Sequence, residues 1–388
     1  MTTRTRRTTL ALTFLLTAGL AACQAAPEPS ARTQGNAAPS SSAGKRRGFT
    51  LVASGDVLPH SSIIRLAGSD AGGTGYDFRP MLAGIKPVVS GADLALCHME
   101  TVYGANGDYT GYPTFKSPPE VAKALADTGY DGCSTASNHT LDDGAAGIHR
   151  TLDALDRAGV RHAGSARTER EAAGTTLLRA GGAQVAHLAY TYGTNGFPLP
   201  EGQPWAVDVI DPDRILADAR AARKEGADVV VVSLHWGSEW QDEPDAQQLD
   251  LGQRLTAART GGRPDIDVII GTHAHVPQAY EKVNGTWVVY GMGDQIAGAM
   301  VNHQGAHDPR GNESSLARFT FAPPAREGAR WEVTKAEFIP QWFDLGPGRV
   351  VNLNEAIARR ALGTDVRDRI RSVVLSRGAA EDGLVMGQ

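Results

Sequence analysis

The sequence predicts an α/β fold in which a mostly parallel or mixed β-sheet lies under helices. Two observations support this prediction: short, continuously apolar runs recur along the chain, and segments with helical periodicity lie between them. Apolar runs without alternation are typical of strands that are buried on both faces. Strands that alternate with helices indicate α/β architecture. The 388 residues exceed one typical domain, but a single large α/β unit accommodates them.

Five apolar runs form the predicted strands. In chain order they are Phe49–Ser54, Ala92–Cys97, Tyr130–Ala136, Val229–Leu234 and Ile266–Ile270. Each run is followed closely by a polar residue that is able to bind a metal or transfer a proton. In open α/β sheets, ligands bind outside the carboxyl ends of the strands. Five such endings in one chain therefore predict a common site at one rim of the sheet.

The segments between these runs carry the signals of helices. The predicted helices are Pro118–Leu125, a segment with an apolar stripe of Ile148, Leu152 and Leu155 that ends at Gly159, Asp211–Glu225, and Gln247–Thr260. After about Val350 the chain is predicted to continue as helix and to end in a polar tail. We therefore expect one domain over residues 48–350, followed by a C-terminal helical extension over residues 351–388.

The N-terminus carries the signals of export. Arg4, Arg6 and Arg7 precede the short apolar run Leu10–Leu20, and small residues then lead to Cys23. This order is typical of a secretory signal peptide, since a membrane span needs about 20 apolar residues. Small residues before a cysteine resemble a bacterial lipobox, which predicts a signal peptide over residues 1–22 and lipidation of Cys23. An ordinary signal peptide with an incidental cysteine is the alternative.

Residues 23–47 are predicted to form a flexible tether, because they are rich in alanine, serine and proline and lack large apolar side chains. Lipid chains on Cys23 would hold the following domain at the outer face of the cytoplasmic membrane. This places the expected location of the mature protein outside the cytoplasm.

Composition limits the class of partner and the redox state. The formal net charge of −5 argues against a nucleic-acid partner, because phosphate binding needs a basic surface. Besides the lipidated Cys23, only Cys97 and Cys133 remain after the predicted cleavage. In an oxidising compartment they form either one disulfide or two buried free thiols, and the sequence leaves both possibilities open.

Six residues near the predicted strand ends are the candidate metal ligands. They are Asp56, Glu100 and Asn138 with oxygen atoms, and His235, His273 and His275 with nitrogen atoms. A set without sulfur suits manganese, iron or zinc, and we expect two divalent cations that share a bridging ligand. Each residue alone also fits an ordinary structural role, such as a turn, a cap or a buried histidine. Their joint occurrence after predicted strands favours a metal site.

Four segments resemble the motif series of the bacterial CapA family, which is named for capsule and poly-γ-glutamate synthesis and is related to calcineurin-like metallophosphoesterases. They are Ser54–Val57, Ala136–Gly144, Ser233–Glu239 and Gly271–Val276. Thr191–Gly196 and Tyr290–Asp294 also follow the order of the family, so the likeness extends from about Phe49 to Ala297. The resemblance implies a calcineurin-like metallophosphoesterase-type fold, in which a central mixed β-sheet sandwich is flanked by helices.

The resemblance also implies roles for individual residues. The first metal would be bound by Asp56 and His275, the second by Asn138, His235 and His273, and Glu100 would bridge them. His139 matches the histidine that protonates the leaving oxygen in related phosphoesterases. Candidates for the substrate side are Tyr192, Trp236 and Glu239, with packing and solvation as their alternative roles.

The chain departs at one place from the related phosphoesterases and at two places from the family's own motifs. Leu58 stands where their Asp-x-His motif has histidine, so the first metal loses a ligand, and His60 is not expected to replace it. His98 and Asp294 stand where the family has other residues. These two side chains are expected either to add ligands or to change the preferred metal.

Two classes of function follow from these features. A metal-dependent hydrolase would activate a water molecule and attack a phosphoester, or an amide bond of poly-γ-glutamate or a cell-wall polymer. A non-catalytic protein would bind an anionic cell-surface polymer and guide it. For either class, a polymer-synthase complex is a candidate partner. Leu58 favours the second class, whereas His139 and the His273-x-His275 pair favour the first. We favour the hydrolase.

Overall fold

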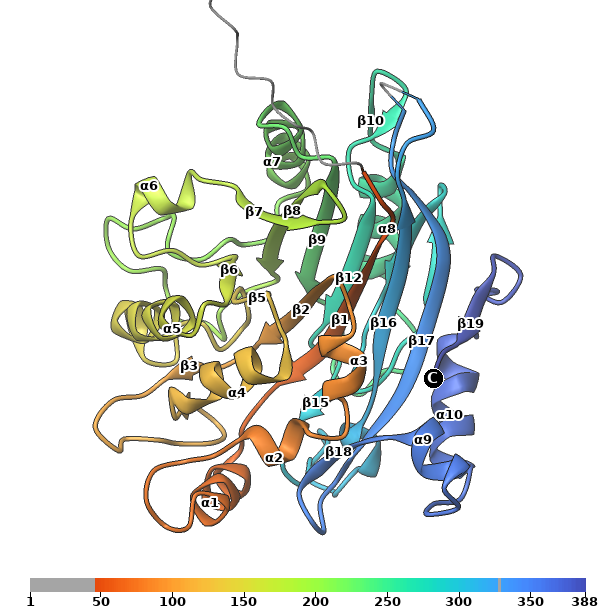
Figure 1. Ribbon diagram of the computed structural model, residues 1–388. Helices are drawn as coiled ribbons and strands as arrows, with labels where there is room; N and C mark the ends of the chain where they lie inside the picture. The colour runs from red at the N-terminus through yellow and green to blue at the C-terminus, as the bar shows by residue number, and fades with distance from the viewer. Residues whose placement is uncertain (1–45, 327–328) are drawn as a thin grey trace, which may run out of the picture. The chain divides into compact units, whose positions relative to one another are not determined.

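The computed structural model describes residues 46–326 and 329–388. The predicted signal peptide, Cys23 and most of the predicted tether therefore lie outside the described residues. Two mixed β-sheets pack against each other, and helices cover their outer faces (Figure 1). This arrangement confirms the predicted sandwich of mixed sheets flanked by helices. Within the described ranges, no helix is both long and apolar enough to cross a membrane.

The first sheet contains the strands that follow the N-terminal segment and those of the C-terminal third. In spatial order its strands are β18 (Arg349–Asn352), β17 (Glu332–Asp344), β16 (Glu313–Ala322), β1 (Phe49–Val57), β2 (Leu94–Met99), β5 (Gly132–Ser134) and β6 (Arg161–Ala163), with β15 (Asp294–Ile296) beside β1 and β19 (Leu384–Met386) beside β17. β1 is parallel to β2 and β15 but antiparallel to β16. The carboxyl ends of β1, β2, β5 and β15 therefore point the same way.

The second sheet is formed by the middle of the chain. In spatial order its strands are β13 (Tyr280–Val283), β14 (Thr286–Val289), β12 (Val268–Thr272), β9 (Val229–His235), β8 (Ala183–Thr191) and β7 (Thr176–Ala180). β8, β9, β12 and β14 are parallel to one another. Two short ladders complete the strands: β3 (Val102–Tyr103) with β4 (Lys116–Ser117), and β10 (Arg259–Thr260) with β11 (Arg263–Pro264).

Alternation along the strands divides the core into layers. On β9, Val229 and Val231 face the first sheet, whereas Val230 and Val232 face α7 and α8 on the outside. All four side chains are fully buried. Each buried valine stabilises the fold by about 1.5–3 kcal/mol relative to an exposed one. Burial on both faces explains why these strands read as continuous apolar runs.

Helices cover the two outer faces and the loops. They are α1 (Ser61–Asp70), α2 (Arg79–Leu82), α3 (Lys86–Ser90), α4 (Glu120–Thr128), α5 (Gly144–Ala158), α6 (Glu169–Ala172), α7 (Pro212–Lys224), α8 (Ala246–Ala257), the 3₁₀ helix η1 (Pro309–Asn312), α9 (Leu353–Ala358) and α10 (Asp365–Val374). The four predicted helices correspond to α4, α5, α7 and α8. α8 ends three residues before the predicted Thr260, because Arg259 and Thr260 pair with β11 instead. Gly159 ends α5 with a φ of 80°, as the sequence predicted.

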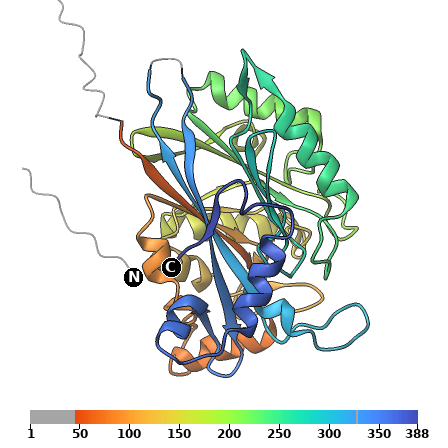
Figure 2. The same ribbon diagram turned by 90° about the vertical axis from the view of Figure 1, so that its right-hand side faces the viewer.

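The C-terminal segment packs into the same core as the rest of the chain. Leu353 on α9, Ile370 and Val374 on α10, and Leu384 on β19 are buried with side chains of both sheets. α10 lies against β16 and β17 (Figure 2). The core therefore continues across residue 350, where the sequence predicted the end of the domain. The predicted polar tail instead ends in β19, which pairs with β17.

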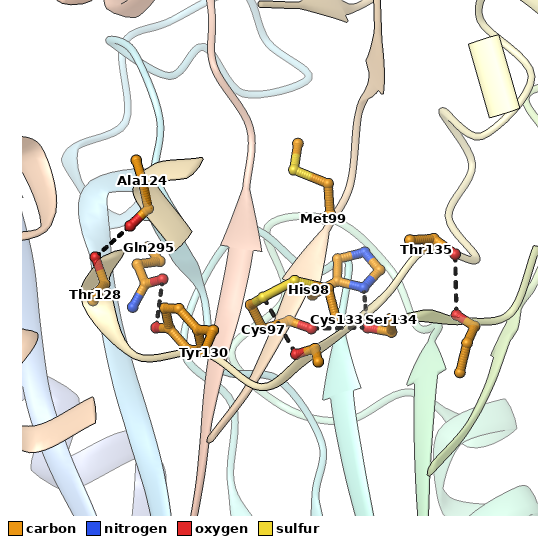
Figure 3. The surroundings of a disulfide bond; sticks show 12 residues. Cys97, His98, Met99, Ala124, Thr128, Tyr130, Cys133, Ser134, Thr135 and Gln295 are labelled. Carbon is orange, nitrogen blue, oxygen red and sulfur yellow. Dashed lines mark hydrogen bonds between the residues drawn. A yellow bond between two sulfur atoms is a disulfide. The ribbon is translucent and has the colours of Figure 1, made fainter. Parts of the chain in front are cut away.

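Cys97 and Cys133 form a disulfide, which decides between the two possibilities that the sequence left open. They are direct neighbours on the parallel strands β2 and β5, with a Cα–Cα distance of 4.4 Å (Figure 3). The next residues on these strands, His98 and Ser134, are joined by a hydrogen bond of 2.6 Å between Nδ1 and Oγ. The disulfide thus fastens two strands directly before their polar ends.

Candidate metal centre

The polar strand ends meet between the two sheets. β1, β2 and β5 belong to the first sheet, whereas β9 and β12 belong to the second. Buried groups of potential ligand atoms nevertheless combine residues from both sheets. The sequence predicted a common site at one rim of a single sheet, and this was wrong in the number of sheets. The rims of two packed sheets form the candidate centre together.

A bulge at the end of β1 turns Asp56 toward the centre. Val52 and Val57 both face the core between the first sheet and the helices that cover it. They are five residues apart and would face opposite ways in a regular strand. The pairing with β2 shifts between Ala53 and Asp56, which accounts for the change. Gly55 is required at this bend, because a Cβ atom there would lie 1.8 Å from the backbone oxygen of Gly293.

Asp56 is one of four buried residues that converge on one point. Asp56, Glu100, His275 and Asp294 each offer one ligand atom, and these atoms lie within 4.8 Å of one another. Oδ1 of Asp56, both carboxylate oxygens of Glu100 and Oδ2 of Asp294 are buried without a hydrogen-bond partner. Unpaired buried carboxylates are costly, and a divalent cation satisfies them. The donor set therefore fits a divalent metal.

The electrostatics of this group agree with that fit. Burial raises the pKa of Asp56 to about 8, and the neighbouring Asp294 carboxylate adds to the effect. Burial and the Asp56 carboxylate raise the pKa of Glu100 well above its usual value. Burial favours the neutral imidazole of His275, but Asp294 and the other carboxylates outweigh it and raise its pKa. The site thus concentrates negative charge that a cation would neutralise.

A second group of ligands lies around His235 at the end of β9. Its Nε2 atom is 3.0 Å from Asn138 Oδ1 and 3.9 Å from Glu100 Oε1. Its ring centroid is 4.7 Å from that of His273 and equally far from that of His98. Burial lowers the pKa of both His235 and His273, so their imidazoles are neutral. Neutral imidazoles offer the lone pairs that metal binding needs.

The His-x-His pair after β12 has an unusual backbone. His273 has a φ of 95° and His275 a φ of 58°, both in the left-handed region that is costly for residues other than glycine. The backbone N–H of His273 donates to Asp56 Oδ2 at 3.1 Å, which connects the two sheets. Both imidazoles also lie within reach of the Glu239 carboxylate. Backbone strain of this kind concentrates at functional sites.

His139 lies next to the candidate ligand Asn138. Its Nδ1 atom is 2.6 Å from Oδ2 of Asp142, which also accepts a hydrogen bond of 2.6 Å from the backbone N–H of Phe115. The Phe115 ring packs edge-on against the imidazole, with 4.8 Å between centroids. The carboxylate therefore holds the His139 imidazole in one orientation through Nδ1.

The three residues predicted for the substrate side occupy different places. Tyr192 is 39% exposed, and its ring centroid is 4.5 Å from that of His273. The Glu239 side chain is half-buried and faces His303, with 3.9 Å between Oε2 and Nε2. Trp236, in contrast, is fully buried in the core between the second sheet and the helices α7 and α8. Its Nε1–H donates to the backbone oxygen of Tyr290. This placement gives Trp236 a packing role instead of contact with a substrate.

The residues at which the chain departs from the expected motifs also have defined places. Leu58 is buried in an apolar cluster with Phe115, Ala297 and Met300. Nδ1 of His60 accepts from the backbone N–H of Gly298, and within the described part of the chain His60 belongs to none of the groups of potential ligand atoms. His98 has an unpartnered Nε2 atom 3.5 Å from Asp56 Oδ1.

The sequence did not reveal the side chains that orient the histidines of the candidate site. Ser134 bonds His98, Thr272 Oγ1 lies 3.0 Å from His235 Nδ1, and Asp142 bonds His139. The spacing of three residues between His139 and Asp142 was a usable signal, because both lie in one turn. The other two pairs join separate strands and have no local signal.

The chain matches one known family and several known proteins. Residues 50–299 match the family model described as "Bacterial capsule synthesis protein PGA_cap". The chain is 28% identical over 181 residues to the capsule biosynthesis protein CapA of Bacillus anthracis, a match that covers 46% of this chain and 42% of that protein. It is 27% identical over 246 residues to a "Probable polyglutamine synthesis accessory protein" of Mycobacterium tuberculosis, covering 60% of this chain and 62% of that protein.

Solved structures share a more distant likeness. The calcineurin-like phosphoesterase YfkN from Bacillus subtilis aligns with a TM-score of 0.45 and 14% identity, over 84% of this chain and 99% of that chain. The 5'-nucleotidase precursor from Thermus thermophilus aligns with a TM-score of 0.42 and 15% identity, over 84% of this chain and 59% of that chain.

Proposed function

Because the chain belongs to the PGA_cap family of bacterial capsule synthesis proteins, we propose that it is an exported, metal-dependent hydrolase that acts on a phosphoester or on an amide bond of an anionic cell-surface polymer. The names of the relatives, which refer to capsule and polyglutamine synthesis, support a substrate related to such a polymer. The N-terminal pattern supports a lipid anchor on Cys23 at the outer face of the cytoplasmic membrane, close to a polymer-synthase complex.

One observation carries the proposal. All six ligands that the sequence suggested lie around one buried centre, although they come from five separate segments of the chain. Three distances support this. Asp56 Oδ2 lies 3.1 Å from the backbone nitrogen of His273. His235 Nε2 lies 3.0 Å from Asn138 Oδ1 and 3.9 Å from Glu100 Oε1. His275 shares its ligand group with Asp56 and Glu100. Packing alone does not explain why ligand atoms of Asp56, Glu100 and His273 are buried without a hydrogen-bond partner.

The ligands divide into two positions. The first would be held by Asp56, Glu100 and His275, and the second by Glu100, Asn138, His235 and His273. Manganese, iron or zinc would suit these oxygen and imidazole donors. Two such cations would supply an acidified water as nucleophile and stabilise the charge that develops in the transition state.

The remaining chemistry belongs to residues of this chain. His139, whose Nδ1 atom is bonded to Asp142, would donate a proton from Nε2 to the leaving group. Tyr192 stands at the exposed side of the centre, and burial, together with the Glu239 carboxylate, raises the pKa of its hydroxyl to about 12. Tyr192 therefore stays protonated at neutral pH and can donate a hydrogen bond to a substrate oxygen.

Activity assays with a matched pair of variants test the proposal. The metal-loaded protein would be assayed on p-nitrophenyl phosphate esters and on poly-γ-glutamate, with His139→Ala as the test and His149→Ala on α5 as the control, since His149 is exposed. Loss of the general acid should lower kcat by about 10²–10⁴-fold without changing the metal content. The His149→Ala variant should keep full activity.

The alternative is a non-catalytic protein that binds the polymer, and the burial of Leu58 in place of a ligand favours it. The same assays separate the two functions. Absence of turnover on both substrates, with tight binding of poly-γ-glutamate by the wild type and by His139→Ala, would support the binding role.

A further inference from the structure

The first metal position has a gap where the related motif supplies histidine. Leu58 stands at that place, is 2% exposed and packs against apolar side chains. It has no atom that binds a metal. Asp56, Glu100 and His275 alone would leave this position with three protein ligands, so the neighbouring side chains decide whether a fourth is present.

Strand β15 brings a fourth candidate to the same point. β15 runs parallel to β1, and Asp294 is the direct partner of Asp56 in the pairing. The Asp294 side chain is fully buried, and its Oδ1 atom is 2.9 Å from His275 Nδ1. Its Oδ2 atom has no hydrogen-bond partner, and Asp294 belongs to the residue group of Asp56, Glu100 and His275. A buried carboxylate oxygen without a partner beside two other carboxylates calls for a cation.

We propose that Asp294 is a direct ligand of the first metal and replaces the histidine that is absent at position 58. The inference rests on the proposed metal centre and adds a ligand to it. Three carboxylates and one imidazole form a harder donor set than the second position, which has two imidazoles. The first position therefore suits manganese better than the second does.

A weaker role for Asp294 is also compatible with the geometry, and the test must separate the two. Through Oδ1 alone, Asp294 would orient His275 without touching the metal, as carboxylates beside metal-bound histidines often do. Asparagine keeps the acceptor oxygen for His275 but loses the anionic ligand. Cysteine replaces a hard oxygen with a soft thiolate, which gives a spectroscopic signal only if it binds the metal.

The experiment measures metal stoichiometry and a charge-transfer band on the full chain. Wild type, Asp294→Asn and the control Asp265→Asn would be dialysed against Mn²⁺ and analysed for bound metal; Asp265 is equally buried but pairs with Arg220, outside the candidate ligand set. Wild type and Asp265→Asn should bind two metals per chain, and Asp294→Asn only one. Asp294→Cys loaded with Cd²⁺ should show a thiolate-to-cadmium absorption band that the wild type lacks.

The outcomes distinguish this inference from the proposed function. A wild type that binds no metal contradicts the proposed function itself. A wild type with two metals and an Asp294→Asn variant that also keeps two overturn only the role of Asp294. The same holds for a folded, cadmium-loaded Asp294→Cys variant without the absorption band. If Asp294→Asn does not fold, the cysteine variant alone decides.

Discussion

His187 on β8 is a buried histidine that lies outside the set of candidate ligands. Its Nε2 atom is 2.9 Å from Ser233 Oγ, and burial lowers its pKa from 6.5 to about 4. The unfolded chain therefore binds a proton below about pH 6.5 while the folded protein does not. The free energy of unfolding is therefore highest above about pH 6.5 and decreases as the pH falls toward 4. The total loss is about 3 kcal/mol.

We expect His187→Gln to reduce this acid sensitivity. Urea unfolding of metal-free protein at about pH 7.5 and about pH 5 would measure the loss of unfolding free energy between the two conditions. The wild type should lose about 2 kcal/mol more than the variant, because the glutamine amide does not titrate. His303→Gln serves as control, since that side chain is 66% exposed. Equal losses in wild type and His187→Gln would contradict the assignment.

At the scale of elements, the contact between β1 and β15 shapes the proposed first metal position. Gly55→Ala should break it, because the new Cβ would lie 1.8 Å from the Gly293 backbone oxygen. We expect a loss of about 1–3 kcal/mol of unfolding free energy or more, and a lower metal content. Gly252→Ala in α8 is the matched control: its Cβ would meet nothing closer than 3.6 Å, and helix propensity favours alanine. Denaturant midpoints and bound metal would be measured for both; retained metal in Gly55→Ala would refute the prediction.

The disulfide between β2 and β5 gives a second prediction at this scale. It closes a loop with a sequence separation of 36 residues. Replacing Cys97 and Cys133 by serine should therefore cost about 2–4 kcal/mol, mainly by freeing the unfolded chain. Urea unfolding with and without a reductant provides the control, because reduction should destabilise the wild type and leave the double variant unchanged. A wild type that is insensitive to the reductant would argue against the bond.

At the scale of the whole molecule, the candidate metal centre lies between the two sheets. Asp56 on the first sheet and His273 after the second are connected directly, and their ligand groups share His275. Removing the metal with a chelator should therefore lower the unfolding temperature of the entire fold. A ligand at 100 times its Kd stabilises the folded state by about 2.7 kcal/mol. Calorimetry with chelator, and again after Mn²⁺ is restored, would measure the effect, and an unchanged unfolding temperature would contradict it.

Much of the candidate centre was predictable because its signals are local. The run from Val229 to Leu234 and the histidine that follows it can be read directly from the sequence, and the pattern indicates a buried strand with a polar end. The same holds for Asp56 and for the His273-x-His275 pair. In contrast, Trp236 follows His235 directly, yet its side chain points away from the candidate centre, into the core beneath α7 and α8. Neighbours in sequence face opposite sides of a strand, and only the packing decides which side is the site.

The sequence by itself determined the α/β class, the main strands and helices, and the six candidate ligands, since apolar periodicity and polar strand ends are properties of short segments. Only the tertiary structure decided that two sheets share the centre, that a bulge turns Asp56 inward, and that Asp294 lies beside it. These features depend on pairing between segments that are far apart in the chain. A single residue of shift in register would move every such side chain to the opposite face.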